Sequence, residues 1–176
     1  MPETTPPSPP PIAILVSRYN DSITSALRDG AREAYLDRFD SPETLAIIEA
    51  PGAFELPALA SAALQSGLYA GVVCLGCVIK GETTHDAHIN SAVAEALASL
   101  SVAAGLPVGF GVLTCQNVEQ ARARAGGDKG NKGREAMEAV LAALDAIRAI
   151  EDAADAETPG MTFTLGRTPA DKGGGV

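Results

Sequence analysis

Short apolar runs alternate with segments of helical periodicity over most of this chain, and that alternation limits the folds it can adopt. The run at 71–79, Gly-Val-Val-Cys-Leu-Gly-Cys-Val-Ile, is apolar nearly throughout, and 12–16 has the same character. Strands of this composition are buried on both faces, as in parallel sheets that helices cover on either side. Parallel strands joined through helices form right-handed crossovers. We therefore predict an α/β fold with a parallel sheet.

The complete pattern predicts four strands and five helices. The strands are expected at 12–16, 44–49, 71–79 and 107–114. The helices are expected at 21–38, 55–65, 86–104, 118–125 and 133–150. The last helix carries one apolar stripe, formed by Met137, Val140, Leu141, Leu144 and Ile147. The expected architecture is a three-layer αβα sandwich around a four-stranded parallel sheet, an arrangement of the flavodoxin-like type.

Both ends of the chain depart from this pattern. Residues 1–11 include six prolines, which lack a backbone N–H and favour extended conformations. Residues 151–176 mix acidic residues with prolines and glycines and show no sustained periodicity. We predict that both segments are disordered and that 12–150 forms a single domain, which is long enough to bury a core of its own.

Charge and composition exclude several classes of protein. The formal net charge of -9 argues against nucleic-acid binding, which relies on a basic field. The longest apolar run, at 71–79, is too short to span a bilayer, so no membrane association is expected. Three cysteines do not form a secreted disulfide framework, and no signal peptide is visible. These features predict a cytoplasmic protein.

Chemically distinctive residues follow each predicted strand. The segments are Ser-Arg-Tyr-Asn at 17–20, Pro-Gly-Ala-Phe-Glu at 51–55, Lys-Gly-Glu-Thr-Thr-His at 80–85 and Cys-Gln-Asn at 115–117. The carboxyl ends of parallel strands lie at one edge of a sheet, and ligands bind just beyond that edge. We therefore expect the four segments to converge on one binding site.

The segment at 80–85 has the widest choice of chemical groups. Gly81 permits close backbone approach, and exposed N–H groups at the start of the next helix favour an anion. His85 can exchange protons near neutral pH. The alternative is a helix-capping threonine followed by a surface histidine, and this segment alone does not decide between the two.

For two other segments, a purely structural explanation is favoured when each is taken alone. Phe54 can stack on a flat heterocycle and Glu55 can accept hydrogen bonds from sugar hydroxyls, but a core phenylalanine and a first-turn glutamate are the favoured explanation. The glycine-rich stretch at 126–133 contains basic residues and suggests a phosphate loop. It lacks Walker A spacing and follows no strand, so a flexible helix connection is favoured.

Neither a redox motif nor a metal site is expected. Cys74 and Cys77 are three apart within a predicted strand, so they point to opposite faces of the sheet. His85 and His88 lie three apart at a helix start, without a clear third ligand. We predict buried thiols, no metal and no cofactor.

Taken together, four of these segments resemble the lumazine synthase family. They are Ser-Arg-Tyr-Asn at 17–20, Pro-Gly-Ala-Phe-Glu-Leu-Pro at 51–57, Cys-Val-Ile-Lys-Gly-Glu-Thr-Thr-His at 77–85, and Arg-Ala-Gly at 124–126 with Asn-Lys-Gly at 131–133. Their order and spacing also match, and the resemblance covers about 12–148. Tyr19 stands where phenylalanine or tryptophan is usual, and Asp-Ala-His at 86–88 lacks an aromatic common after the histidine.

The resemblance implies a transferase of riboflavin biosynthesis. Its substrates would be 5-amino-6-(D-ribitylamino)uracil and 3,4-dihydroxy-2-butanone 4-phosphate, and its product 6,7-dimethyl-8-ribityllumazine. His85 matches the residue that donates and accepts protons. The residues matching the substrate pocket are Tyr19, Ala53, Phe54, Glu55, Cys77, Val78, Ile79, Glu82, Thr83, Phe110 and Arg124, and Lys132 and Glu135 match polar residues nearby.

The resemblance also implies which part of the substrates most of these residues would contact. Tyr19 would stack on the pyrimidine, with 77–79 beside it, and 53–55 would hold the ribityl chain. Glu82, Thr83 and Arg124 would bind the phosphate. Phe110 would reach the pocket of a neighbouring subunit.

Family members form homopentamers with active sites between subunits, and some build a shell of twelve pentamers. The stretch at 126–133 is as short as in shell-forming members, but the prolines before Ile12 argue against the N-terminal strand those members use. We expect an isolated pentamer or a pair, with riboflavin synthase as a candidate partner. The alternative function is a non-catalytic protein that binds lumazine or flavin. A flavodoxin-like electron carrier lacks support, because no glycine-rich loop follows the first strand.

Overall fold

The computed structural model describes residues 8–165, and its centre is one parallel sheet. Its strands lie in the order β2-β1-β3-β4. Their bounds are β1 (Ile12–Ser17), β2 (Leu45–Ala50), β3 (Gly71–Ile79) and β4 (Val108–Cys115). All three pairings are parallel, which confirms the predicted sheet.

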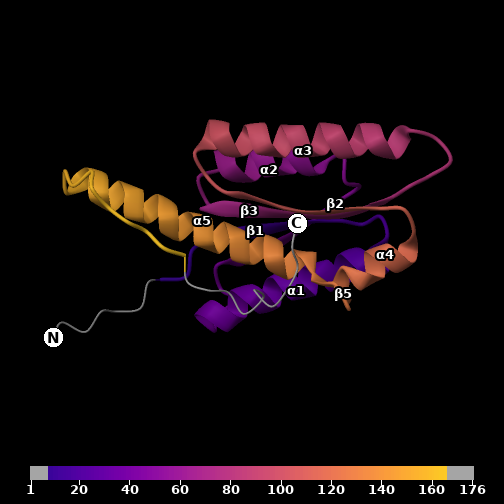
Figure 1. Ribbon diagram of the computed structural model, residues 1–176, viewed down its shortest axis with the longest axis horizontal. Coiled ribbons are helices and arrows are strands. Elements are labelled where there is room, and N and C mark those ends of the chain that lie inside the picture. The colour runs from indigo at the N-terminus through magenta and orange to yellow at the C-terminus, as the bar shows by residue number, and fades with distance from the viewer. Residues whose placement is uncertain (1–7, 166–176) are drawn as a thin grey trace.

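Helices cover both faces of this sheet, which completes the predicted three-layer sandwich. One face packs against α1 (Asp21–Phe39) and α5 (Lys132–Asp155), and the other against α2 (Leu56–Gln65) and α3 (His85–Ala104) (Figure 1). The short helix α4 (Val118–Ala123) follows β4. A small antiparallel hairpin of β5 (Ala125–Gly127) and β6 (Gly130–Asn131) leads into α5.

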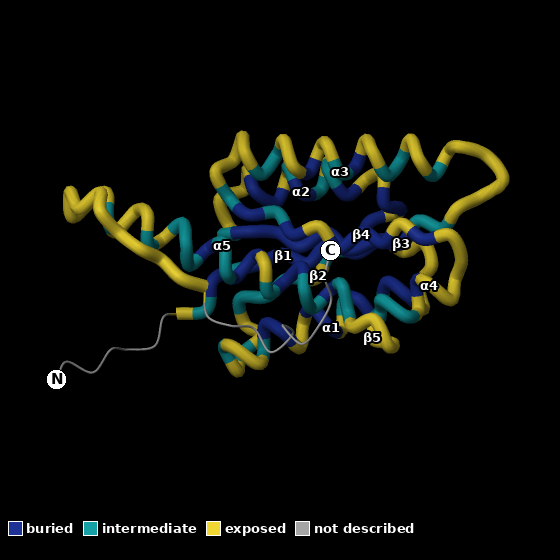
Figure 2. The backbone as a smooth tube through the Cα atoms, viewed as in Figure 1, coloured by how far each residue is buried: buried dark blue, intermediate teal, exposed yellow. Residues whose placement is uncertain are grey.

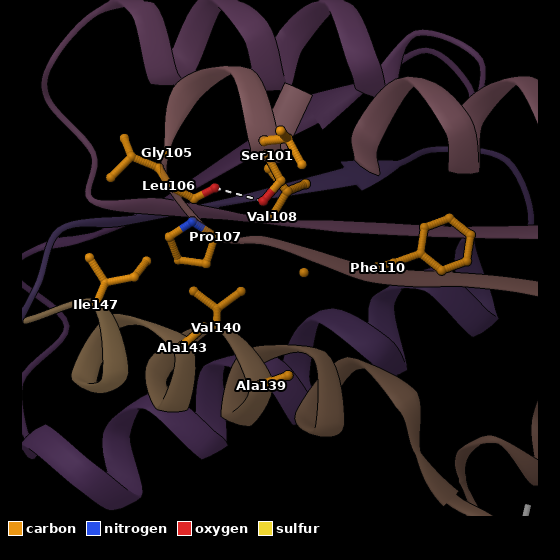
Figure 3. A pocket seen from close by; sticks show the side chains of 12 residues that line it. Ser101, Gly105, Leu106, Pro107, Val108, Phe110, Ala139, Val140, Ala143 and Ile147 are labelled. Carbon is orange, nitrogen blue, oxygen red and sulfur yellow. Dashed lines mark hydrogen bonds between the residues drawn. The ribbon is translucent and has the colours of Figure 1, made fainter. Parts of the chain in front are cut away.

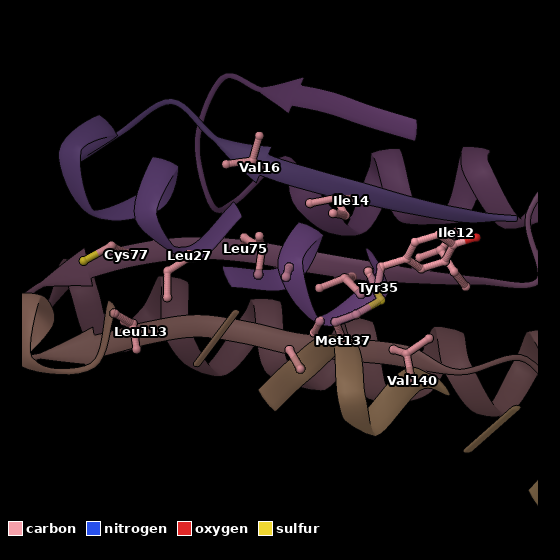
Figure 4. Close-up of a cluster of buried hydrophobic side chains, with 14 of the residues drawn as sticks. Ile12, Ile14, Val16, Leu27, Tyr35, Leu75, Cys77, Leu113, Met137 and Val140 are labelled. Carbon is pink, nitrogen blue, oxygen red and sulfur yellow. The ribbon is translucent and has the colours of Figure 1, made fainter. Parts of the chain in front are cut away.

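The core is two layers of apolar side chains, one on each face of the sheet, and β1 supplies both. Ile12, Ile14 and Val16 join the layer beneath α1 and α5 (Figure 4). Ala13 and Leu15 join the layer beneath α2 and α3. Successive strand residues point to opposite faces, so a strand buried on both sides must be apolar at every position. Figure 2 shows the buried strands enclosed by helices whose outer faces are exposed.

The thiols follow the same alternation. Cys74 lies in the layer beneath α2 and α3, whereas Cys77 lies in the layer beneath α1 and α5. Both are buried and free, as is Cys115. The prediction of separate buried thiols is therefore confirmed.

Two features differ from the predicted pattern. The last helix was expected to end at Ile150, but it continues to Asp155 because no glycine or proline interrupts it before Pro159. The stretch at 126–133, expected as a flexible connection, contains the β5–β6 hairpin. Of the two segments predicted to be disordered, residues 1–7 and 166–176 lie outside the described residues. Within 8–165, no helix is both long and apolar enough to cross a membrane.

Candidate active site

The four loops after the strands meet at one edge of the sheet, as predicted. Ser17 is level with Ala50, and Ile79 is level with Cys115, so neighbouring strands end together. Backbone hydrogen bonds continue past these ends. The N–H of Arg18 donates to the Ala50 carbonyl at 3.0 Å, and that of Lys80 donates to the Cys115 carbonyl at 2.8 Å. This edge is where a doubly covered parallel sheet binds ligands.

A ring and a carboxylate come together over Gly52. A methyl group added at Gly52 would lie 2.9 Å from Oε2 of Glu55 and 3.4 Å from Cδ2 of Tyr19. Tyr19 is 72% exposed, so its ring is accessible to a flat ligand. Glu55 is also exposed, whereas Ala53 beside it is buried. An aromatic face and a hydrogen-bond acceptor thus approach the same point.

Asn20 connects the loop that carries Tyr19 to the end of β3 through a hydrogen bond. Its backbone is left-handed, with φ 58° and ψ 47°, a conformation that asparagine tolerates better than most residues. Its Nδ2 donates to the Cys77 carbonyl at 2.9 Å. Sequence reasoning identified the segment but gave Asn20 no role of its own. We call Tyr19, Gly52, Glu55, Asn20 and Cys77 the ring end of the site.

The thiols beneath the ring end are protonated at neutral pH. Burial, and then the nearby Cys115 thiol, raise the pKa of Cys77 to about 11. Burial also raises the pKa of Cys115, although the positive charge of Arg124 acts in the opposite direction. Cys77 therefore contributes shape to the site rather than a thiolate. Val78 and Ile79, the next residues of β3, are half-buried at the same edge.

A second group of polar residues gathers near the end of β4. Arg124 belongs to this group, since its positive charge acts on the Cys115 thiol at that strand end. Arg124 is half-buried, and its Nη1 donates to the Gln120 carbonyl at 3.1 Å. The backbone N–H of Lys132 donates to the Arg124 carbonyl at 2.9 Å. The side chain of Lys132 pairs with Glu135, with Nζ 2.5 Å from Oε2. We call Arg124, Lys132, Glu135 and the β5–β6 hairpin the anion end, because a guanidinium and an ammonium suit a phosphate.

His85 is the first residue of α3 and is exposed. Its backbone N–H donates to Oγ1 of Thr83 at 3.4 Å, and Glu82 and Thr83 are exposed beside it. Thr84 occupies the cap position without a side-chain capping bond, and the hydroxyl that accepts an N–H at the helix start belongs to Thr83. The alternative of a capping threonine followed by a surface histidine therefore still describes this segment. Within the described residues the imidazole makes no hydrogen bond, which leaves both ring nitrogens available to a ligand.

Phe110 is the predicted site residue that this chain does not bring to the strand ends. It pairs with Cys74 near the start of β4, five residues before Cys115, or about 16 Å along the strand. It is 47% exposed. It lines a separate cavity of about 500 Å³ with Val140 and Ile147 of α5 (Figure 3). Phe54 is likewise exposed, at 61%.

Residues 10–148 match the family model of 6,7-dimethyl-8-ribityllumazine synthase. The chain belongs to the lumazine synthase family. It is 47% identical over 119 residues to the 6,7-dimethyl-8-ribityllumazine synthase of Rhodopirellula baltica, an alignment that covers 68% of this chain and 77% of that one. It is 42% identical over 122 residues to that of Nautilia profundicola (68% and 79% covered), and 43% identical over 122 residues to that of Sulfurovum sp. (68% and 78%). Membership of this family supports a transferase of riboflavin biosynthesis and gives no support to a non-catalytic binding protein.

Proposed function

We propose that this lumazine synthase family member condenses 5-amino-6-(D-ribitylamino)uracil with 3,4-dihydroxy-2-butanone 4-phosphate. The products are 6,7-dimethyl-8-ribityllumazine, phosphate and water. The observation that carries the proposal is the layout of one sheet edge. An open ring and a carboxylate lie at its ring end, and two cations lie at its anion end. One end suits a ribityl-substituted pyrimidine and the other suits a phosphate.

At the ring end, the Tyr19 ring stacks on the pyrimidine, and 77–79 form the wall beside it. Cys77 shapes this wall through its main chain rather than its thiol, because its side chain is buried and its carbonyl accepts a hydrogen bond from Asn20. Ala53, Phe54 and Glu55 accommodate the ribityl chain, with the Glu55 carboxylate accepting hydrogen bonds from its hydroxyls.

At the anion end, Arg124 binds the phosphate of the second substrate with two parallel N–H donors. Glu82 and Thr83 contribute from the loop that precedes α3, where backbone N–H groups and the helix dipole favour an anion. Lys132 adds a second positive charge, and its partner Glu135 holds the ammonium in place. Gripping the phosphate fixes the ketone carbon opposite the pyrimidine amine.

The chemistry requires proton transfers and no enzyme nucleophile. The 5-amino group of the uracil attacks the ketone carbon, and loss of water gives an imine. Loss of a carbon-bound proton expels the phosphate and leaves an enol, which becomes a ketone. The ribitylamino nitrogen then closes the second ring with loss of another water. His85 donates and accepts these protons, while orientation of two bound substrates supplies much of the acceleration.

A second copy of the chain completes the pocket in this proposal, as part of a homopentamer. The wide exposure of Tyr19 and Phe54, together with the distance of Phe110 from the same chain's strand ends, supports a shared site. Phe110 of one subunit would reach the ring end of the next. The association with riboflavin synthase and the cytoplasmic location remain predictions.

Turnover by the purified protein tests the proposal. Both substrates are mixed with the protein, and formation of the lumazine is followed by its absorbance. We expect acceleration over the uncatalysed reaction, a large loss in Arg124→Ala, and a partial loss in His85→Ala because positioning survives. Arg122→Ala is the matched control, since it removes an exposed arginine from α4, the helix that Arg124 directly follows. Tight product binding without acceleration would instead support the binding-protein alternative.

A further inference from the structure

The Asn131 side chain links three elements around the anion end. Its Oδ1 accepts hydrogen bonds from the backbone N–H of Gly133 at 2.9 Å and of Arg134 at 3.2 Å, which caps the start of α5. Its Nδ2 donates to the Ala26 carbonyl of α1 at 2.8 Å. Asn131 itself belongs to β6, so one amide connects the hairpin, α5 and α1. Figure 1 shows these elements together near β5.

Two glycines make room for this link. A methyl group at Gly30 of α1 would overlap the side-chain amide of Asn131. A methyl group at Gly133 would overlap the Leu27 carbonyl, again on α1. A glycine inside a helix costs stability relative to alanine, so Gly30 is unfavourable for α1 alone. Its presence is explained by the space that the Asn131 amide occupies.

Asn131 is connected through the backbone to both cations of the anion end, Arg124 and Lys132. Asn131 pairs with Ala125 in the hairpin, and Ala125 directly follows Arg124. Lys132 directly follows Asn131, and its N–H donates to the Arg124 carbonyl. The contact between Asn131 and Ala26 therefore holds the hairpin that carries Arg124 against α1, beside the close packing of Gly133 on Leu27. The helix α1 begins at Asp21, five residues before Ala26, next to Asn20 and the ring end.

We propose that Asn131 is a positioning residue that sets the distance between the anion end and the ring end by tying the hairpin to α1. This inference rests on the proposed function, because it assumes that Arg124 and Lys132 bind the phosphate of one substrate. The amide acts through those cations and touches neither substrate.

Asn131→Ser is the sharpest test. Serine keeps a good helix cap for α5 but is too short to hold Ala26, so it separates the two roles of the amide. We expect the KM for the butanone phosphate to rise about tenfold, while that for the ribitylaminouracil stays within about twofold. Inorganic phosphate, used as a competitive inhibitor, should weaken by a similar factor. Ser66→Ala, which removes two hydrogen bonds at the far end of α2, is the matched control and should change neither KM.

Gly30→Ala approaches the same contact from α1 and keeps the test valid if Asn131→Ser folds poorly. The added methyl displaces the amide, so the same selective rise in KM is expected. In the Asn131→Ser background the shorter side chain leaves space, so Gly30→Ala should then have little further effect. Equal rises in both KM values, or additive effects in the double variant, would overturn the inference. No turnover and no phosphate inhibition in the unmodified protein would instead remove the proposed function on which it rests.

Discussion

The ring end and the anion end of this site are held in place by different means. The ring end stands on the carboxyl ends of β1, β2 and β3, and β1 and most of β3 are buried on both faces. The anion end stands on a short hairpin outside the main sheet and on the first turn of α5, and the Asn131 amide and backbone hydrogen bonds join these two parts to each other and to α1. The residue positions at the ring end depend on core packing, which is strong and non-directional. The residue positions at the anion end depend more on a few directional hydrogen bonds.

The largest expected effect is on the core beneath the ring end. Leu75 of β3 is fully buried, so Leu75→Ala should lower the free energy of unfolding by about 2–5 kcal/mol through lost burial and a cavity. Chemical denaturation measures this. Leu68→Ala, at an exposed leucine, is the matched control and should stay within about 0.5 kcal/mol. A similar cost at both positions would show that the ring end does not rest on this core.

A smaller and more selective effect is expected at Gly52. The added methyl of Gly52→Ala meets the Glu55 carboxylate and the Tyr19 ring, so both must move. We expect the KM for the ribitylaminouracil to rise about tenfold while that for the butanone phosphate changes less than about twofold. Steady-state kinetics with each substrate varied in turn provide the measurement. A rise confined to the phosphate substrate would contradict the division of the site into two ends.

The smallest effect is expected at the surface pairing of α1 with α5, which lies away from both ends. Nη2 of Arg38 lies 2.7 Å from Oδ2 of Asp145, and both side chains are about a third exposed. Solvent screening limits such a pair, so Arg38→Gln should cost at most about 1 kcal/mol, and less at high salt. Denaturation at two salt concentrations checks this. Altered KM values in this variant would mean that helix packing reaches the site more broadly than we infer.

Most of the fold could be predicted from the sequence because its signals are local. The stripe on α1, formed by Ile23, Leu27, Ala31 and Ala34, is buried as its spacing predicts. On α3, Val93 and Leu97 are fully buried, whereas Ile89 and Leu100 are partly buried at the layer's margin. Every predicted strand is present, with ends within about one residue.

The parts that could not be predicted depend on distant contacts. Residues 126–133 have no apolar periodicity, so nothing local indicates a hairpin. The contact between Asn131 and Ala26 joins residues 105 apart in sequence, and the need for Gly30 appears only when α1 and α5 are seen together. The convergence of the ring end was predictable because the strand-end rule is itself local. The role of Phe110 needs a second subunit, so it stays a prediction.

The most direct test of the account is a crossed kinetic comparison of Tyr19→Ala and Arg124→Ala. If the two ends each bind one substrate, Tyr19→Ala raises the KM for the ribitylaminouracil and Arg124→Ala raises that for the butanone phosphate. Each shift should be on the order of tenfold to a hundredfold. The other KM in each variant should change little. Variants that raise both KM values equally, or that each affect the opposite substrate, would contradict the assignment of the two ends.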